Sequence, residues 1–202
     1  MAAVRGVVFD VGNVLFTWDP RFLYERLIDD DRALDAFLRE VVTQEWHFQH
    51  DAGRPFSETS AELVAKHPQH RELIELWGPR FNDSVGPPVE GMISLVEELD
   101  MNGVPLFAIT NFSGEFWATF RNTQPVFDRF RDIVVSGTER LVKPHGEIYE
   151  LALRRFGMPA EELIFIDDRA ENVAGAEAVG MRGHLFRDAE VLRAELKRLD
   201  LL

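Results

Sequence analysis

The sequence feature that most constrains the fold is an alternation of short apolar strands with helical segments. The expected strands are rich in Val and Ile and are bounded by Gly, Asn, Ser or Asp. They cover residues 4–9, 104–109, 133–135 and 163–166, and the helical segments cover residues 89–101, 114–122, 146–156 and 170–179. Strands joined through helices pair in parallel, and continuous apolar strands of this kind need helices on both faces. The alternation therefore predicts an α/β sandwich of three layers around a parallel sheet.

Glycines punctuate this pattern where the predicted helices should stop. Gly103 and Gly157 each follow a predicted helix and precede a predicted strand. Glycine adopts the left-handed backbone of a helix stop at low cost, so it is typical of this position. Gly180 stands in the same position before a further candidate strand at residues 183–186. Residues 189–202 then have the pattern of an amphipathic helix that covers the core.

One region, residues 21–81, breaks the alternation, since its helical periodicity runs without a convincing strand. We interpret it as an inserted small helical cap and expect the cap domain over 18–85 and the core domain over 1–17 and 86–202. The aromatic side chains of this region are expected to form the cap's own core. Residues 46–51 stand out, because Trp, His, Phe, Gln, His and Asp follow one another there.

The composition excludes several classes of partner. The chain of 202 residues has 35 acidic and 22 basic side chains and a net charge of -13, and the basic residues are scattered. A nucleic-acid partner is therefore not expected, because phosphate backbones are bound through a basic surface. No run of 18 apolar residues occurs, so no membrane span is predicted. The absence of Cys excludes disulfides and thiolate sites and is compatible with the cytoplasm, where we expect the protein.

Polar residues follow three of the predicted strands at the point where each strand ends. Asp10 ends the first strand, Thr110 and Asn111 end the second, and Asp167 and Asp168 end the fourth. The loop after the third strand brings Lys143 to the same edge. In an open parallel sheet, ligands bind at the carboxyl ends of the strands. We therefore expect these side chains to form one site.

Four motifs in this order resemble those of the haloacid dehalogenase superfamily, which consists mostly of phosphatases. They are Phe9-Asp10-Val11-Gly12-Asn13-Val14, then Ile109-Thr110-Asn111, then Lys143-Pro144 with Ile148-Tyr149, and finally Phe165-Ile166-Asp167-Asp168 with Asn172. The resemblance spans essentially the whole chain and implies a Rossmann-like core with a small cap inserted after the first strand. The residue sequence of the first motif is most similar to that of the branch that includes alpha-D-glucose-1-phosphate phosphatase.

The resemblance implies a phosphatase that forms an aspartyl-phosphate on Asp10. A carboxylate that attacks a dianionic phosphate meets like-charge repulsion, so a hard divalent cation is expected between them. The implied cofactor is Mg²⁺, held by Asp10, the backbone carbonyl of Gly12 and Asp168, with Asp167 beside it to orient water. The substrate is expected to be a small phosphorylated metabolite, with sugar phosphates among the candidates.

The remaining roles concern the transferring phosphoryl group. Lys143 is expected to neutralise its charge and that of the nucleophile, while Thr110 and the Asn111 backbone N–H hold phosphate oxygens. Asn172 is expected to orient Lys143 or the metal site.

The first motif departs from the familiar phosphatase pattern at Gly12. A second Asp stands there in that pattern and serves as general acid and base, help that is worth about 10²- to 10⁴-fold in rate. Cap residues His47 and His50 are our candidates to replace it and to bind substrate, since His titrates near neutral pH. A substrate with a good leaving group would need less help.

Two other functions are compatible with a glycine at position 12 instead of the second Asp. A metal-independent 2-haloacid dehalogenase needs no acid for its halide leaving group, but Asp167 and Asp168 would repel the carboxylate of a haloacid. A catalytically weak domain that binds a phosphorylated ligand is the third interpretation. Together, Asp10, Thr110, Lys143 and Asp168 argue against it.

Overall fold

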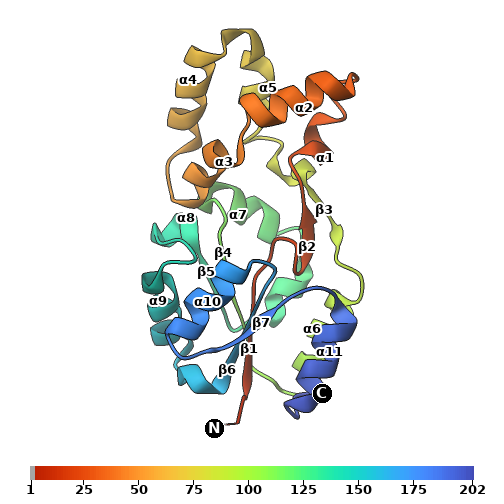
Figure 1. Cartoon of the computed structure of the whole chain (residues 1–202), viewed down its shortest axis with the longest axis vertical. Coiled ribbons are helices and arrows are strands. Elements are labelled where there is room, and N and C mark those ends of the chain that lie inside the picture. Colours follow the sequence, from red (N-terminus) through yellow and green to blue (C-terminus); the bar gives the residue numbers. More distant parts are fainter. Residues whose placement is uncertain (1–2) are drawn as a thin grey trace.

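Five parallel strands form the sheet at the centre of the lower lobe in Figure 1, a computed structural model in which residues 3–202 are described. The first two positions of the expected core segment 1–17 lie outside the described residues. Across the sheet the order is β5 (Asp132–Val135), β4 (Leu106–Thr110), β1 (Gly6–Phe9), β6 (Leu163–Asp167) and β7 (Arg182–Leu185). The chain moves from β1 towards β5 and then returns to the other side of β1, which makes the end of β1 the switch point where such sheets bind ligands.

Helices cover both faces of the sheet, which confirms the predicted α/β sandwich. Successive side chains of a strand point to opposite faces, so Val7 and Phe9 pack in one apolar cluster and Val8 in the other. The first face is covered by α6 (Met92–Met101), α7 (Gly114–Arg121) and α11 (Ala189–Arg198), and the second by α9 (Gly146–Phe156) and α10 (Ala170–Ala178). A short helix, α8 (Ser136–Glu139), follows β5, and 3-10 turns cover Pro125–Arg129 and Ala160–Glu162.

The predicted glycine stops are confirmed by the backbone. Gly103, Gly157 and Gly180 have φ values of 75°, 65° and 95°, and each closes a helix of the core. Among the described residues, no helix is both long enough and apolar enough to cross a membrane.

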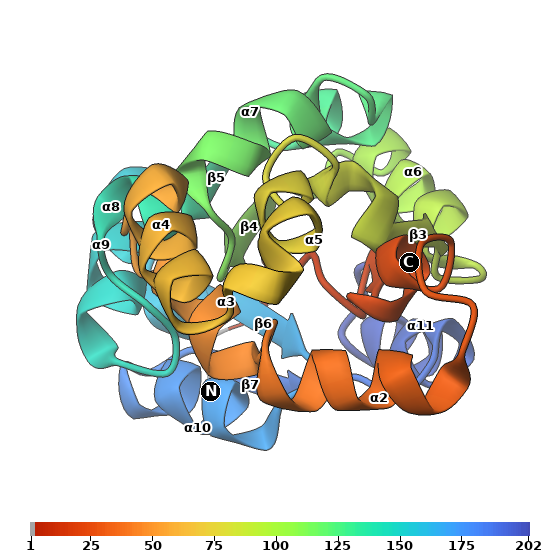
Figure 2. The same ribbon diagram turned by 90° about the horizontal axis from the view of Figure 1, so that it is seen from above.

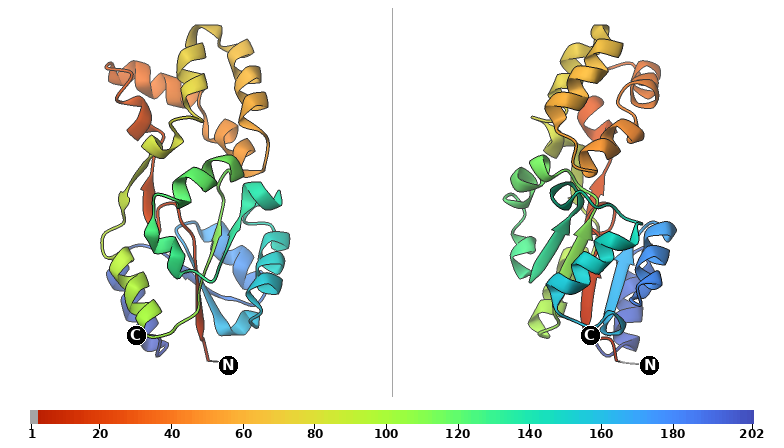
Figure 3. Two further views of the ribbon diagram at one scale, coloured as in Figure 1. Left: turned by 180° about the vertical axis from the view of Figure 1, so that it is seen from behind. Right: turned by 90° about the vertical axis from the view of Figure 1, so that its left-hand side faces the viewer.

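Five helices stand on the carboxyl edge of the sheet in all views (Figures 1, 2 and 3). They are α1 (Arg21–Tyr24), α2 (Asp31–Glu40), α3 (Gln44–Asp51), α4 (Phe56–Lys66) and α5 (Arg71–Leu76), with 3-10 turns at Pro68–His70 and Phe81–Ser84. Tyr24 and Trp77 are fully buried and stack with ring centroids 5.8 Å apart, so this group of helices has an apolar core of its own. Its division from the rest as a domain over 18–85 remains our proposal.

A two-stranded antiparallel ribbon, which the sequence analysis did not predict, connects the two lobes. It pairs β2 (Phe16–Trp18) with β3 (Val85–Pro88). Pro87 and Pro88 lie exposed on this edge strand, where the missing N–H of proline costs little.

Candidate active site

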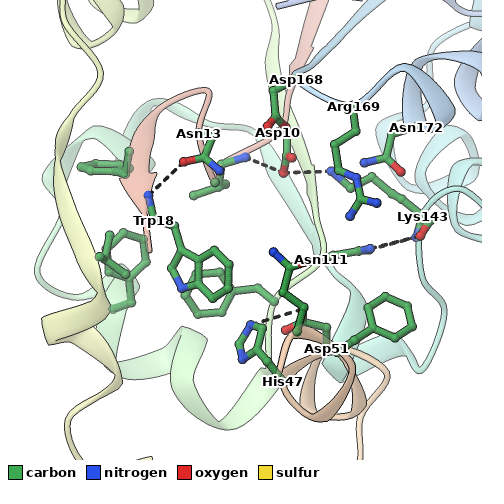
Figure 4. A pocket seen from close by; sticks show the side chains of 18 of the residues that line it. Asp10, Asn13, Trp18, His47, Asp51, Asn111, Lys143, Asp168, Arg169 and Asn172 are labelled. Carbon is green, nitrogen blue, oxygen red and sulfur yellow. Dashed lines mark hydrogen bonds and ion pairs between the residues drawn. The ribbon is translucent and has the colours of Figure 1, made fainter. Parts of the chain in front are cut away.

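A cavity of about 320 Å³ lies where the cap meets the carboxyl ends of the central strands (Figure 4). Its polar lining comes from the ends of β1 and β6, from the loops after β4 and α8, and from α3 and α10. The polar residues are Asp10, Asn13, Gln44, His47, Asp51, Asn111, Lys143, Asp168, Arg169 and Asn172. The residues that we predicted at the sheet edge, Asp10, Asn111, Lys143 and Asp168, therefore line one cavity although they are far apart in the sequence.

Lys143 lies at the centre of this group as a buried cation between two carboxylates. Its Nζ is 2.8 Å from Asp10 Oδ1 and 2.6 Å from Asp167 Oδ2, and the side chain is almost fully buried. The Val11 backbone N–H also donates to Asp10 Oδ1, at 2.6 Å. Burial raises the pKa of Asp10 to about 7 even though Lys143 opposes the shift. The Asp10 carboxylate is thus fixed in direction and destabilised by burial, and it needs positive charge nearby.

Asp167 is held entirely by groups of the protein. Its Oδ1 accepts hydrogen bonds from the Arg169 backbone N–H at 2.9 Å and from Asn172 Nδ2 at 3.0 Å, while Oδ2 accepts from Lys143. Asn172 was expected to orient Lys143 or the metal site. It contacts Asp167, and so it acts on the ammonium group only through that carboxylate. Asp167 itself is fully buried beneath the cavity.

The three acids at this edge fit a divalent cation. Asp10, Asp167 and Asp168 each offer a carboxylate oxygen, and these oxygens lie within 4.8 Å of one another. Three carboxylates face only one ammonium group, and burial together with Asp167 raises the pKa of Asp168. Because both oxygens of Asp167 are already bonded, Asp10 and Asp168 are the acids with oxygens directed to the cavity. Hard oxygen ligands of this kind suit Mg²⁺.

Asn111 holds the loop that carries Lys143. Its Nδ2 donates to the Lys143 carbonyl at 3.1 Å, and its Oδ1 accepts from the Lys143 backbone N–H at 2.9 Å. The reciprocal pair fixes the lysine backbone to the end of β4. Thr110 is buried at the end of β4 but is not among the described residues that line the cavity.

The structure separates the two cap histidines. His50 points away from the cavity, and its Nε2 lies 2.6 Å from Thr59 Oγ1. His47 lines the cavity and stacks on Trp18 with ring centroids 4.8 Å apart. Burial, with smaller effects of neighbouring charge, lowers the pKa of His47 to about 3 and that of His50 to about 4. Both rings are therefore neutral near pH 7 and are poor proton donors, contrary to the role we expected for them.

The carboxyl group that α3 does bring to the cavity is Asp51, which the sequence analysis did not propose as a site residue. Its Oδ2 lies 3.5 Å from His47 Nε2, and the residue is only 6% exposed. Burial and the nearby charge of Asp10 raise the pKa of Asp51 to about 8. The i,i+4 spacing of His47 and Asp51 was the available signal, since it places both side chains on one face of a helix.

Close packing between the cap and the core fixes the end of α3. The Asp51 carbonyl accepts a hydrogen bond from Ser136 Oγ at 2.6 Å, and Ser136 Oγ accepts from the Phe112 backbone N–H at 2.9 Å. Gly137 lies beside this contact, where an added Cβ would be 2.5 Å from Gly114 N and 2.8 Å from Phe112 O in the core, and 3.0 Å from the His50 carbonyl oxygen of α3. A side chain at this position would therefore displace the core backbone first and would also crowd α3.

Aromatic side chains also line the cavity. They are Phe16, Trp18, Phe48, Phe81, Phe112 and Phe120. We expected Phe48 and Phe81 to pack within the cap. Phe81 does so against Trp77 and also lines the cavity, whereas Phe48 is partly exposed and contributes to the cavity wall. Phe48 is 41% exposed, which is unusual for so large an apolar side chain.

Comparison with known proteins agrees with this geometry. The family model for haloacid dehalogenase-like hydrolases matches residues 4–180. The chain is 29% identical to the sesquiterpene phosphatase astK of Aspergillus oryzae, over 96% of both chains. It is 27% identical to the phosphoglycolate phosphatase of Yersinia pseudotuberculosis, over 88% of this chain and 78% of that protein. The structure also resembles the magnesium complex of a HAD family enzyme from Bacteroides thetaiotaomicron, with a TM-score of 0.72, 17% identity and coverage of 95% and 100%.

Proposed function

This chain belongs to the haloacid dehalogenase-like hydrolases, and we propose that it is a Mg²⁺-dependent phosphatase that acts through an aspartyl-phosphate on Asp10. The observation that carries the proposal is the group of Asp10, Lys143 and Asp168 at the switch point of the sheet. Two curated relatives with phosphatase names, each matching most of the chain, support the same reaction.

The residues around Asp10 prepare it for attack on phosphorus. The Val11 N–H and Lys143 Nζ both contact Oδ1, and together they fix the direction of the attacking carboxylate. As the new P–O bond forms and the bond to the leaving group breaks, Lys143 offsets the negative charge of the phosphoryl group. Asp167 holds Lys143 in place throughout. Water then attacks phosphorus and releases phosphate from Asp10.

Asp10, the backbone carbonyl of Gly12 and Asp168 would hold Mg²⁺. The cation supplies positive charge between the nucleophile and the substrate phosphate and thereby lowers their repulsion. Thr110 and the Asn111 backbone N–H remain our predicted contacts to phosphate oxygens.

The aromatic wall favours a phosphate ester of a small apolar alcohol over a sugar phosphate. A sugar would bring several hydroxyl groups against Trp18, Phe48, Phe81 and their neighbours, and burying a hydroxyl without a partner costs free energy. An apolar group would instead cover exposed ring surface. The relative named as a sesquiterpene phosphatase acts, by that name, on a terpenoid ester, which supports the same class for this chain.

Phosphate release is the direct test. The panel contains an aryl phosphate, prenyl and alkyl phosphates, phosphoglycolate and sugar phosphates, each with Mg²⁺ and with EDTA. We expect release that needs both Mg²⁺ and Asp10, so Asp10→Asn abolishes it, while Asp29→Asn on the exposed surface of the cap keeps it. Phosphate release that EDTA or Asp10→Asn leaves intact would overturn the proposal. Halide release from 2-haloacids with no phosphate release would favour the dehalogenase instead.

A matched pair of variants tests the substrate class. Full burial of a Phe side chain contributes roughly 1.5–3 kcal/mol. Covering the exposed part of Phe48 should therefore contribute about 1 kcal/mol, so we expect Phe48→Ala to lower kcat/KM for prenyl phosphates about fivefold. Met101→Ala, at a residue 77% exposed and outside the cavity, is the control. Sugar phosphates turned over faster than prenyl phosphates would contradict the class.

A further inference from the structure

Asp51 is a buried carboxyl group of the cavity that the chemistry above does not use. It lies at the end of α3 and lines the cavity that Asp10 and Lys143 line from the core side (Figure 4). Its Oδ2 contacts His47, and Oδ1 is buried and makes no hydrogen bond with any of the described residues, although the nearby Ser113 backbone N–H lowers the pKa of the carboxyl group. A buried oxygen without a protein partner is costly, and a catalytic role, a bound water and a bound ion are among the reasons for which one is retained.

The core, and not the cap alone, fixes where this carboxyl group lies. The hydrogen bond from Ser136 Oγ to the Asp51 carbonyl ties the end of α3 to the start of α8. Gly137 allows the backbones to approach at this contact. The position of Asp51 relative to the nucleophile is therefore set by a packed junction, as a catalytic group requires.

The charges around Asp51 favour its protonated form. The groups that face it are His47 on its own helix, and Asp10 and Lys143 across the cavity. Burial and Asp10 raise its pKa to about 8, whereas Lys143 opposes the shift. His47 is neutral near pH 7, since burial lowers its pKa to about 3. A proton is thus available at Asp51 near neutral pH and is not available at His47.

We propose that Asp51 is the general acid and base of this enzyme and supplies from the cap the function for which Gly12 has no side chain. The inference rests on the proposed phosphatase function. A carboxylate oxygen of Asp10 forms a bond to phosphorus, the bond from phosphorus to the leaving oxygen breaks, and that oxygen takes the proton of Asp51. The Asp51 carboxylate then takes a proton from water as the water oxygen attacks phosphorus. The bond from phosphorus to Asp10 breaks, phosphate leaves, and Asp51 is protonated again.

The first test compares two esters that differ in their need for a proton. An alkyl phosphate leaves as a basic alkoxide unless it is protonated, whereas 2,4-dinitrophenyl phosphate leaves without help. With Mg²⁺ present, we expect Asp51→Asn to lower kcat/KM for the alkyl ester about 10²- to 10⁴-fold and for the dinitrophenyl ester less than about tenfold. A burst of dinitrophenol should also appear, because hydrolysis of the aspartyl-phosphate has lost its base.

Equal losses of kcat/KM on the two esters would overturn the proposal, since a purely structural role affects both alike. The control is Glu45→Gln, which removes an exposed acid from the same helix and should leave both esters unaffected. Circular dichroism and thermal unfolding establish whether Asp51→Asn folds. The wild-type pH profile needs no variant: kcat/KM for the alkyl ester should fall as pH rises through the pKa of Asp51, which burial raises, while that for the dinitrophenyl ester does not. Identical profiles for the two esters would also overturn the proposal.

The second test restores the acid on the core side. An added Cβ at Gly12 meets nothing within 4 Å, so Gly12→Asp fits the backbone as it stands. In the Asp51→Asn background, Gly12→Asp should raise kcat/KM for the alkyl ester at least about tenfold. No recovery in a variant that still hydrolyses the dinitrophenyl ester would count against the proposal. If the wild type releases phosphate from neither ester, the proposed function itself fails.

Discussion

Replacing Lys143 by Met should destabilise the protein far more than the loss of one lysine normally does. The ammonium group lies 2.8 Å from Asp10 and 2.6 Å from Asp167, and all three side chains are buried. Met fills a similar volume but leaves the carboxylates without their cation. Removing one partner of a buried ion pair costs about 3–5 kcal/mol, because the remaining charge has neither water nor a partner.

The assay is urea unfolding followed by circular dichroism at pH 7.5 in EDTA, which gives the free energy of unfolding. In thermal unfolding of a chain of this length each kcal/mol lowers Tm by about 2–4 °C, so the expected decrease in Tm is about 6–20 °C. The matched control is Lys197→Met, which removes an exposed lysine from α11 and should change the free energy of unfolding by less than about 0.5 kcal/mol.

Two further measurements separate charge from packing. Added Mg²⁺ should stabilise Lys143→Met more than it stabilises the wild type, because it restores positive charge beside Asp10 and Asp168. Acidification to pH 5.5 should also reduce the difference between variant and wild type, since Asp10 is then protonated in the fold. A loss below about 1 kcal/mol, or a loss that neither Mg²⁺ nor acid reduces, would refute the reasoning.

Two more predictions concern the cap junction and pH. Gly137→Ala should lower the free energy of unfolding by about 1–3 kcal/mol in urea titrations, because its Cβ would lie 2.5 Å and 2.8 Å from backbone atoms; an unchanged midpoint would contradict this. In EDTA, the free energy of unfolding should decrease from about pH 6.5 to about pH 8, whereas below pH 6.5 the lowered pKa values of His47 and His50 offset this trend. The folded pKa values of Asp10 and Asp51, about 7 and about 8, lie above the ordinary value of 3.8, so the fold keeps protons that the unfolded chain releases. A midpoint that rises over this range would contradict the assignment.

The fold and the core side of the site were predictable because they depend on local patterns. Apolar strands in alternation with helices admit few arrangements other than a parallel sheet with covered faces. The carboxyl ends of those strands share an edge, so Asp10, Asn111 and Asp168 had to lie near one another once the sheet formed. The glycine stops at Gly103 and Gly157 were also local, since they depend only on the backbone angles at one residue.

The ribbon between the lobes was not predictable, because β2 has only three residues and β3 contains Pro87 and Pro88. A strand of that length carries too few alternating side chains to be recognised. Its pairing depends on where the cap leaves and rejoins the core, which is a property of the assembled chain.

By itself, the sequence determined the sheet, its covering helices and the acids and lysine at its edge. Tertiary structure decided which face of α3 meets the cavity, so that His47 and Asp51 line it while His50 packs on Thr59. It also decided the protonation of these groups. Burial raises the pKa of Asp51 and lowers that of His47, and burial is fixed only when α3 docks on the core at Ser136 and its neighbours.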